Sequence, residues 1–211
     1  MEILSFDLLP STQKYLIDEL KTGRINPPCA VIALEQSAGV GSRDNEWSGG
    51  KGNFFASIAI PLDQLPTDLP LSSASIYFSY IMKQVLLEFN ENIWLKWPND
   101  FYLNDEKIGG TITKKIDQIL VCGIGINLKN DQNGYKALSV DIHPEILLEK
   151  YLFTLKKFPK WKDIFSEYQV EFELSRRFSA HVENLKMSLS DASLEEDGSL
   201  LINGKKVYSL R

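Results

Sequence analysis

The stretch IWLKWPNDFYLNDEKIGG, residues 93–110, is the most informative part of this chain and decides how a group of charged residues is placed. It begins with a run of aromatic and branched residues, Ile93 to Trp97, which is typical of a β-strand. Pro98 has no amide hydrogen for a sheet ladder, so the strand should end there. Residues 101–103 resume an extended pattern after this break, and residues 104–106 are turn formers. The stretch therefore predicts a hairpin.

Three charged residues stand at the ends of this predicted hairpin. Lys96 and Asp100 flank the turn after its first strand, and Lys107 begins the return strand. Hairpin pairing predicts that the two ammonium groups and the carboxylate converge, as they would in a reaction site. The alternative is a surface hairpin whose charges are separately solvated.

Composition places the chain in a globular class. Of its 211 residues, 44% are apolar, enough to fill the core of one medium domain with a small appendage. A net charge of −5 argues against a non-specific nucleic-acid binder. No apolar run approaches membrane-spanning length, and the first residues lack a secretory signal pattern. We therefore expect a cytoplasmic protein with no membrane partner.

Cysteines and histidines do not support two common kinds of catalytic site. Cys29 and Cys122 each lie in an apolar, strand-like run, so we expect buried free thiols rather than a disulfide or a catalytic pair. His143 and His181 have no partners at metal-ligand spacing. Zinc catalysis and Ser-His-Asp chemistry are therefore poorly supported, and the metal ligands are unknown.

Helical and extended patterns alternate along the first 174 residues. A short strand precedes a helix from Thr12 to Lys21, with Ser11 as its N-cap and Gly23 as its stop. Periodicity then predicts strands at 29–36, 53–61 and 118–126, a helix at 71–90 whose apolar stripe faces a sheet, and helices at 144–158 and 159–177.

The last segment has a different pattern. Asp197-Gly198 and Asn203-Gly204 are strong hairpin signals. The short extended pieces lie at 182–190, 192–195, 199–202 and 205–209. Such pieces fit a meander or a minimal SH3-like barrel. We therefore divide the chain into a domain at 1–174 and a small β domain at 175–211.

Two glycine-rich stretches fail as common phosphate-binding motifs. Residues 39–44 have an aspartate where a dinucleotide fingerprint needs its third glycine, and no helical pattern follows. Residues 49–52 lack the spacing of a P-loop. There remains a loop at 36–47 whose glycines can present backbone amides to an anion, while Arg43 adds charge. Taken alone, such a loop needs no function.

Taken together, the motifs of residues 1–175 resemble the biotin–protein ligase family. They follow in the family's order: Ser11-Thr12-Gln13, Gln36 to Gly41, Trp47, Asn53 to Ser57, Lys96 to Asp100, Lys107 to Gly110 and Gly123 to Asn127. The set is specific. The resemblance implies an α+β fold of the class II synthetase type, in which helices flank a mixed sheet, with a small C-terminal SH3-like β appendage.

The resemblance also implies an activity. Members of this family condense biotin with ATP to biotinyl-5'-adenylate and pyrophosphate, and then pass the biotinyl group to one lysine of a biotin carboxyl carrier protein. Biotin and ATP would be the substrates, and Mg²⁺ would help to neutralise the triphosphate. The sequence leaves the oligomeric state open, with a homodimer as one option.

Residue roles are carried over position by position. Lys107 would contact the biotin carboxylate and the α-phosphate, where negative charge accumulates. The biotin site would also contain Ser11, Thr12, Gln13, Gln36, Gly39, Gly41, Gly110 and Gly125. The nucleotide site would contain Val40, Ser42, Arg43, Trp47, Asn99, Lys107 and Asn127. Trp47 would offer a flat face to adenine, although a lone tryptophan is more often ordinary packing.

The glycine-rich loop departs from the family pattern. Val40 and Ser42 stand where the family usually has arginines, and Arg43 is the loop's one arginine. We therefore expect Arg43 to act as a catalytic residue that contacts phosphate, together with backbone amides near Gly41 and Ser42. Asp100, the remaining catalytic candidate, would either orient the acceptor lysine or cap the strand end.

Two other functions remain open. Lipoate ligases and octanoyltransferases share the general fold, although the tryptophan in the 96–100 motif favours biotin. A protein on this scaffold that binds biotin without activating it is the second alternative. Ten residues precede Ser11, too few for the helix-turn-helix that some family members carry, so DNA is not an expected partner.

Overall fold

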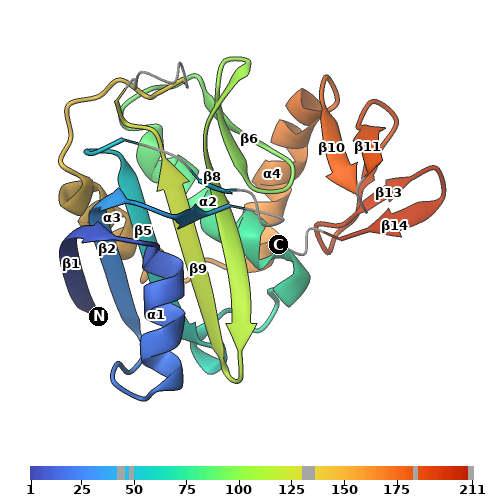
Figure 1. The fold of residues 1–211 in the computed structure, drawn as a ribbon. Helices are drawn as coiled ribbons and strands as arrows, with labels where there is room; N and C mark the ends of the chain where they lie inside the picture. The colour runs from blue at the N-terminus through green and yellow to red at the C-terminus, as the bar shows by residue number, and fades with distance from the viewer. Residues whose placement is uncertain (42–45, 48–49, 130–135, 183–184, 209–211) are drawn as a thin grey trace.

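The centre of the fold is a seven-stranded mixed sheet in the order β1-β2-β5-β9-β8-β7-β6 (Figure 1). The structure is a computed structural model that describes residues 1–41, 46–47, 50–129, 136–182 and 185–208. β1 and β2 run parallel, and the other neighbouring strands of the sheet run antiparallel. The strands are β1 (Glu2–Leu9), β2 (Cys29–Gln36), β5 (Phe54–Pro61), β6 (Ile93–Lys96), β7 (Asp100–Leu103), β8 (Glu106–Ile116) and β9 (Ile119–Ile126).

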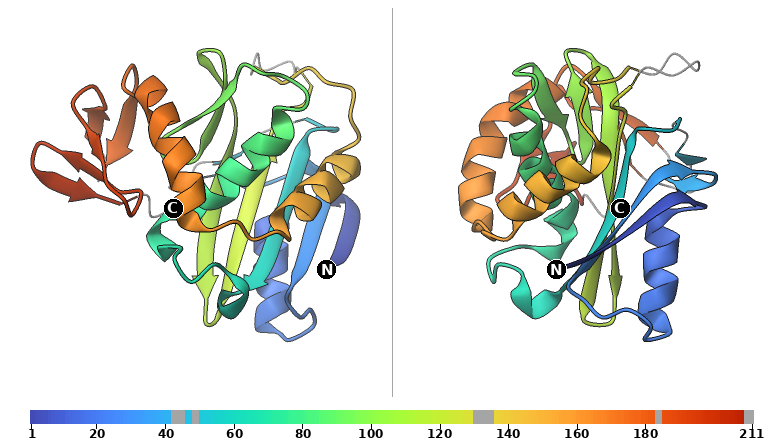
Figure 2. Two further views of the ribbon diagram at one scale, coloured as in Figure 1. Left: turned by 180° about the vertical axis from the view of Figure 1, so that it is seen from behind. Right: turned by 90° about the vertical axis from the view of Figure 1, so that its left-hand side faces the viewer.

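Helices cover both faces of this sheet (Figure 2). α1 (Thr12–Lys21) packs on β2, β5 and β9 from one side. The other side carries α2 (Ala74–Leu86), α3 (Pro144–Leu155) and α4 (Trp161–Ser175), with short 3₁₀ turns at Leu62–Gln64 and Leu71–Ser73. The helices predicted from the sequence are confirmed, and three of them are shorter than expected. In the part of the chain that is described, no helix is long and apolar enough to cross a bilayer.

α1 begins and ends as the sequence predicts. The backbone of Ser11 is extended, and its hydroxyl oxygen accepts a hydrogen bond from the amide of Lys14 at 3.4 Å. Gly23 follows the helix with a φ of +70°, in the left-handed region that glycine tolerates best. The start of α1 is thereby fixed at the end of β1, beside the last residues of β2.

The two faces of the sheet carry different cores. Even-numbered residues of β9, from 120 to 126, belong to a large apolar cluster with side chains of α2, α3 and α4. Val121, on the opposite face, belongs to a small cluster with Leu16 and Ile17 of α1. This alternation follows from the two-residue period of a strand. Most of the apolar core therefore lies on the face covered by α2, α3 and α4, and polar groups can be placed on the face that carries α1.

Helix α4 covers one edge of the sheet. Ser175 Oγ accepts a hydrogen bond from the amide of Trp97 at 3.0 Å, and the Glu171 carboxylate accepts one from the amide of Leu95. Glu171 also forms a mostly buried ion pair with Lys83 of α2. Two outward-facing amides at the β6 edge are thereby satisfied within the molecule.

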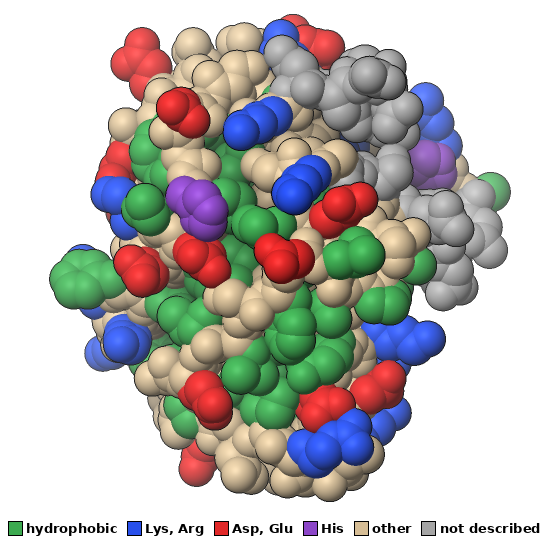
Figure 3. Space-filling view, turned by 60° about the vertical axis from the view of Figure 1, so that its left-hand side comes forward, with side chains coloured by type: hydrophobic (Ala, Val, Ile, Leu, Met, Phe, Trp, Pro, Cys, Tyr) green, Lys and Arg blue, Asp and Glu red, His purple; other side chains and the backbone are tan. Residues whose placement is uncertain are grey.

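The other edge of the sheet is β1. It pairs with β2 on one side and stands at the end of the strand order. Ile3 and Leu8 of β1 are exposed apolar residues. On the side of the molecule that Figure 3 shows, apolar side chains occupy the middle of the face and charged ones surround them.

Two small antiparallel sheets follow α4. β10 (Ser179–Val182) pairs with β11 (Leu185–Ser188), and β13 (Leu200–Ile202) pairs with both β12 (Ser193–Leu194) and β14 (Lys205–Val207). The Asp197-Gly198 and Asn203-Gly204 turns are confirmed as hairpin connections. The single extended piece expected at 182–190 is wrong, because Val182 ends one strand and Leu185 begins its partner. The sequence between them holds no glycine or proline to mark that break.

Candidate functional site

A cavity of about 290 Å³ lies on the α1 face of the sheet, at the N-terminal end of that helix. Its walls come from the start of α1, the end of β2, the middle of β5, and the facing strands β8 and β9. A two-stranded ribbon, β3 (Gly39–Val40) paired with β4 (Glu46–Trp47), adds a further wall. Segments far apart in the sequence therefore meet around one hollow.

Most residues singled out from the sequence line this cavity. They are Ser11, Thr12, Gln13, Gln36, Val40, Gly41, Trp47, Asn99, Asp100, Lys107, Gly110, Gly125 and Asn127. Gly39 is not among the lining residues and instead pairs with Trp47 across the β3–β4 ribbon. Ser42 and Arg43 lie outside the described residues, so the expected phosphate contact of Arg43 stays a prediction, as do the roles of the others.

Charges at the hairpin ends converge as predicted. Lys107 Nζ lies 2.7 Å from Asp100 Oδ1, and Lys96 Nζ lies 4.0 Å from Asp100 Oδ2. The pairing of β7 with β8 shifts register between Phe101 and Tyr102, a bulge of the kind that re-aims side chains. The side chain of Lys107 is 42% exposed, so a ligand in the cavity can reach it. The alternative of separately solvated charges is wrong.

A chain of hydrogen bonds fixes the polar groups at the α1 end of the cavity. Gln36 Oε1 accepts from the amide of Thr12 at 2.7 Å and from its hydroxyl at 3.1 Å. Thr12 Oγ1 lies in turn 2.9 Å from Ser57 Oγ. Ser57 is fully buried and lines the cavity, and the sequence analysis missed its role. The available signal was that it is the one hydroxyl residue in the apolar strand β5.

Glycines allow the β3–β4 ribbon to lie directly on β9. A Cβ atom on Gly125 would stand 2.7 Å from Trp47 Cε2, and one on Gly39 would stand 2.5 Å from the Trp47 carbonyl oxygen. Both distances are too short for a side chain. The indole of Trp47 thus closes over the Gly125 backbone, and Lys107 Nζ lies 5.8 Å from the centre of its ring.

Four residues of the cavity wall hold buried polar atoms that have no hydrogen-bond partner among the described residues. These atoms are Trp47 Nε1, Asn99 Oδ1, Thr111 Oγ1 and Asn127 Oδ1. The amide nitrogen of Asn99 donates to the Thr111 carbonyl, and that of Asn127 donates to the Lys136 carbonyl at 3.2 Å. Buried polar atoms are normally paired, so this cluster marks a place where a polar ligand could bind. Thr111 was also missed, because one threonine in a strand carries no signal.

The described part of the chain has neither clustered metal ligands nor an activated cysteine. The described residues contain no group of three or more His, Cys, Asp or Glu side chains that could hold a metal ion. Cys29 and Cys122 are free and buried, as predicted. Burial, with a smaller contribution from Glu2, raises the pKa of Cys29 to about 11, and burial raises the pKa of Cys122 well above its usual value. Neither thiol is activated as a nucleophile.

Comparison with known proteins gives two kinds of sequence match. A profile of the biotin/lipoate A/B protein ligase family matches residues 5–131. The bifunctional ligase/repressor BirA of Escherichia coli (strain K12) is 31% identical over 128 residues, which cover 57% of this chain and 39% of that protein. The match therefore spans about two fifths of the length of that curated relative.

Solved structures share the whole architecture. The biotin acetyl coenzyme A carboxylase synthetase from Helicobacter pylori, solved with bound biotinylated ATP, is 38% identical, with a TM-score of 0.93 over 98% of this chain and 99% of that chain. The biotin protein ligase from Aquifex aeolicus, in complex with biotin and ATP, is 21% identical. Its TM-score is 0.76 over 100% of this chain and 96% of that chain, so the two proteins have the same fold. The expected fold class is thereby confirmed. Because the family profile spans more than half of the sequence, the chain belongs to the biotin/lipoate A/B protein ligase family.

Proposed function

We propose that this protein activates biotin with ATP and transfers the biotinyl group to a lysine of a biotin carboxyl carrier protein. The observation that carries the proposal is the Lys107 ammonium, which reaches the wall of the cavity and lies 2.7 Å from Asp100. The similarity to a synthetase solved with biotinylated ATP supports biotin as the acid that is activated. Because ATP is a substrate, we place the reaction in the cytoplasm.

Activation must bring two anions together. A carboxylate oxygen of biotin bonds to the α-phosphorus of ATP, and the bond from that phosphorus to the bridging oxygen of pyrophosphate breaks. Pyrophosphate leaves with the bonding electrons, so negative charge builds up on both sides of the phosphorus. A fixed cation at this point lowers the barrier because it is already in place. Lys107 supplies that cation, and Asp100 restrains its side chain before the substrates bind.

Transfer uses the same groups in a second step. The neutral amine of the acceptor lysine attacks the carbonyl carbon of the mixed anhydride, and AMP leaves with the electrons of the broken carbon–oxygen bond. The amine then loses a proton to give the amide. Lys107 again faces the phosphate oxygen on which charge develops. No side chain of the protein needs to become acylated, which agrees with the buried state of both cysteines.

The two ends of the cavity suit the two substrates. Ser11, Thr12 and Gln36 offer hydroxyl and amide groups for the ureido edge of biotin, while Gly110 and Gly123 leave room for its rings. The nucleotide end offers Trp47, with Asn99 and Asn127, whose amide oxygens have no partner in the described part of the chain. Arg43 would contact phosphate. Mg²⁺ would enter with ATP as part of the substrate, since the described residues hold no cluster of acidic ligands.

The test is exchange of labelled pyrophosphate into ATP by the purified protein. We expect exchange that depends on biotin and is absent with lipoate or octanoate in its place. Exchange with lipoate but not with biotin would identify a lipoate ligase instead. Binding of biotin without any exchange would identify a protein that binds biotin without activating it. Transfer is then scored as biotin bound covalently to an added carrier protein, whose acceptor lysine is replaced by arginine in the control.

A further inference from the structure

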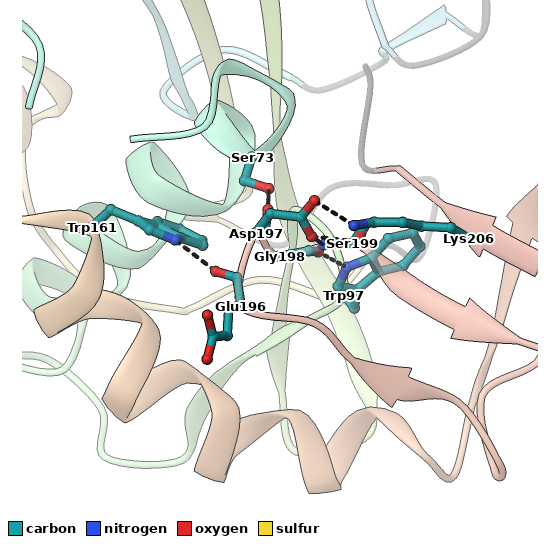
Figure 4. Close-up of polar contacts among 8 residues, drawn as sticks. All are labelled: Ser73, Trp97, Trp161, Glu196, Asp197, Gly198, Ser199 and Lys206. Atoms are coloured by element: carbon teal, nitrogen blue, oxygen red, sulfur yellow. Dashed lines mark hydrogen bonds and ion pairs between the residues drawn. The ribbon is translucent and has the colours of Figure 1, made fainter. Parts of the chain in front are cut away.

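The turn between β12 and β13, residues 195–199, is held by three side chains from the rest of the molecule (Figure 4). Three consecutive backbone carbonyls of the turn each accept one hydrogen bond from a different element. The pairs are Trp161 Nε1 with the Glu196 carbonyl at 2.9 Å, Ser73 Oγ with the Asp197 carbonyl, and Trp97 Nε1 with the Gly198 carbonyl at 3.0 Å. The turn therefore joins α4, the start of α2 and the end of β6 at one point.

The turn is also braced from within. The amide of Gly198 donates to the Glu195 carbonyl at 2.8 Å, and the amide of Glu195 donates to the Ser199 carbonyl at 2.9 Å. The Asp197 carboxylate accepts from the amide of Ser199 at 3.1 Å and pairs with Lys206 of β14 at 2.8 Å. Partial burial raises the pKa of Asp197, but these two partners outweigh it and keep the pKa below its usual range. Because these hydrogen bonds restrain the turn, it can restrain the side chains of Ser73, Trp97 and Trp161 that bind to it.

Trp97 connects this turn to the cavity. Its side chain is 1% exposed, and its backbone amide is bound to Ser175, so the residue is fixed at both ends. The register of β6 and β7 pairs Lys96 with Asp100, which leaves a tight turn whose first residue is Trp97. Asn99, in the same turn, accepts at its carbonyl from the amide of Thr111 at 3.0 Å. A shift of the indole would therefore move the backbone that carries Asn99 and Asp100.

On the basis of the proposed function, we propose that the 195–199 turn positions Asn99 and Asp100 for biotin activation through the indole of Trp97. Trp97 and Gly198 are not among the residues that line the cavity, so they are positioning residues. Asp100 is the partner of Lys107, so a displaced Asp100 changes where the ammonium stands. The last small sheet would thus contribute to the reaction without touching a substrate.

Trp97→Phe and Trp161→Phe form a matched pair that tests this proposal. Each substitution keeps an aromatic ring and removes one indole donor to one carbonyl of the same turn. A purely structural role predicts that both variants lose activity in proportion to their loss of melting temperature. Positioning predicts instead that Trp97→Phe lowers kcat for pyrophosphate exchange by about tenfold. Trp161→Phe should keep kcat within about twofold, because the bond from Trp97 to the Gly198 carbonyl stays in place.

Nuclear magnetic resonance gives a second measurement that does not depend on activity. In the ligand-free protein, the side-chain amide signal of Asn99 should shift in Trp97→Phe and stay in place in Trp161→Phe. An unmoved Asn99 signal in Trp97→Phe, or equal losses of kcat in the two variants, would overturn the positioning role. If the wild-type protein shows no exchange, the proposed function fails by itself, and the Asn99 signal still decides whether the turn positions this residue.

Gly198→Ala and Gly204→Ala provide a second matched pair if Trp97→Phe does not fold. Gly198 and Gly204 have φ values of +78° and +77°, so an alanine is equally strained at either position. A Cβ on Gly198 would stand 2.5 Å from Ser73 Oγ, whereas one on Gly204 would meet no atom of the described residues within 4 Å. In Gly198→Ala alone, the turn and Ser73 must therefore move apart, which disturbs the contact that holds the turn at this point. We expect the Asn99 shift and the kcat loss in that variant only, and the same result in both variants would refute the proposal.

Discussion

One face of the central sheet carries large apolar side chains, and the other carries glycines and polar side chains. The first face contributes most to stability, and the second forms the candidate site. Along β9, residues 120, 122, 124 and 126 fill the large core, while Gly123 and Gly125 on the other face leave the space of the cavity. Along β5, Ile58 packs into the large core, and its neighbour Ser57 belongs to the polar chain beside Gln36. One face can remain hollow because the other buries most of the apolar surface.

Replacing Lys107 should produce the largest effect on the cavity face with little effect on the fold. Lys107→Ala removes the cation that faces the reacting phosphate, so pyrophosphate exchange should fall by about 100- to 1000-fold. Its ion pair is partly exposed, so unfolding free energy should change by about 1 kcal/mol or less. Lys136→Ala is the control, because Lys136 pairs with Glu106 at 3.2 Å and does not line the cavity. A Lys107→Ala enzyme with more than a tenth of wild-type exchange would exclude Lys107 from the reaction.

A truncation in the large core should show the reverse pattern. Ile58 is fully buried, so Ile58→Ala should lower the free energy of unfolding by about 3 kcal/mol. Chemical denaturation measures this loss, and exchange assayed well below the melting temperature should keep the wild-type KM for biotin. A large rise of that KM in a folded Ile58→Ala protein would show that the two faces are not independent.

Gly125→Ala should affect binding by adding volume where the cavity needs space. The new Cβ would stand 2.7 Å from Trp47 Cε2, so the indole and its ribbon must move away. We expect affinity for biotin and a non-hydrolysable ATP analogue, measured by calorimetry, to fall by about tenfold. Gly123→Ala is the matched comparison, because its Cβ would meet its nearest neighbours at 3.4 Å, an ordinary contact. Equal affinities in the two variants would show that the position of Trp47 does not affect ligand binding.

Ser57→Ala should give the smallest of these effects. The substitution removes the hydroxyl that lies 2.9 Å from Thr12 Oγ1 and leaves Gln36 less firmly held. One such hydrogen bond is worth about 1 kcal/mol, so the KM for biotin should rise by about fivefold. The KM for ATP should not change, since Ser57 belongs to the end of the cavity that we propose for biotin. An equal rise in both values would point to a general loosening of the sheet.

Local sequence patterns were enough to predict the hairpin and the helix that carry much of the site, but not the β3–β4 ribbon, which lies in the segment interpreted as a loop. The hairpin at 93–110 is marked by Pro98 and by its turn residues, and helix α1 by its Ser11 cap, because these signals act within a few positions. The contacts that complete the site join distant residues. Ser57 meets Thr12 across 45 positions, and Trp97 meets Gly198 across 101. Such pairs depend on tertiary packing, so neither partner carries a local mark.

Helix α4 has a consequence for how this sheet can meet other molecules. A strand of another molecule could pair with β6 only if the hydrogen bonds from the amides of Leu95 and Trp97 to Glu171 and Ser175 were broken first. Lateral growth of the sheet, whether in a specific assembly or in aggregation, is therefore disfavoured at that margin and directed toward β1.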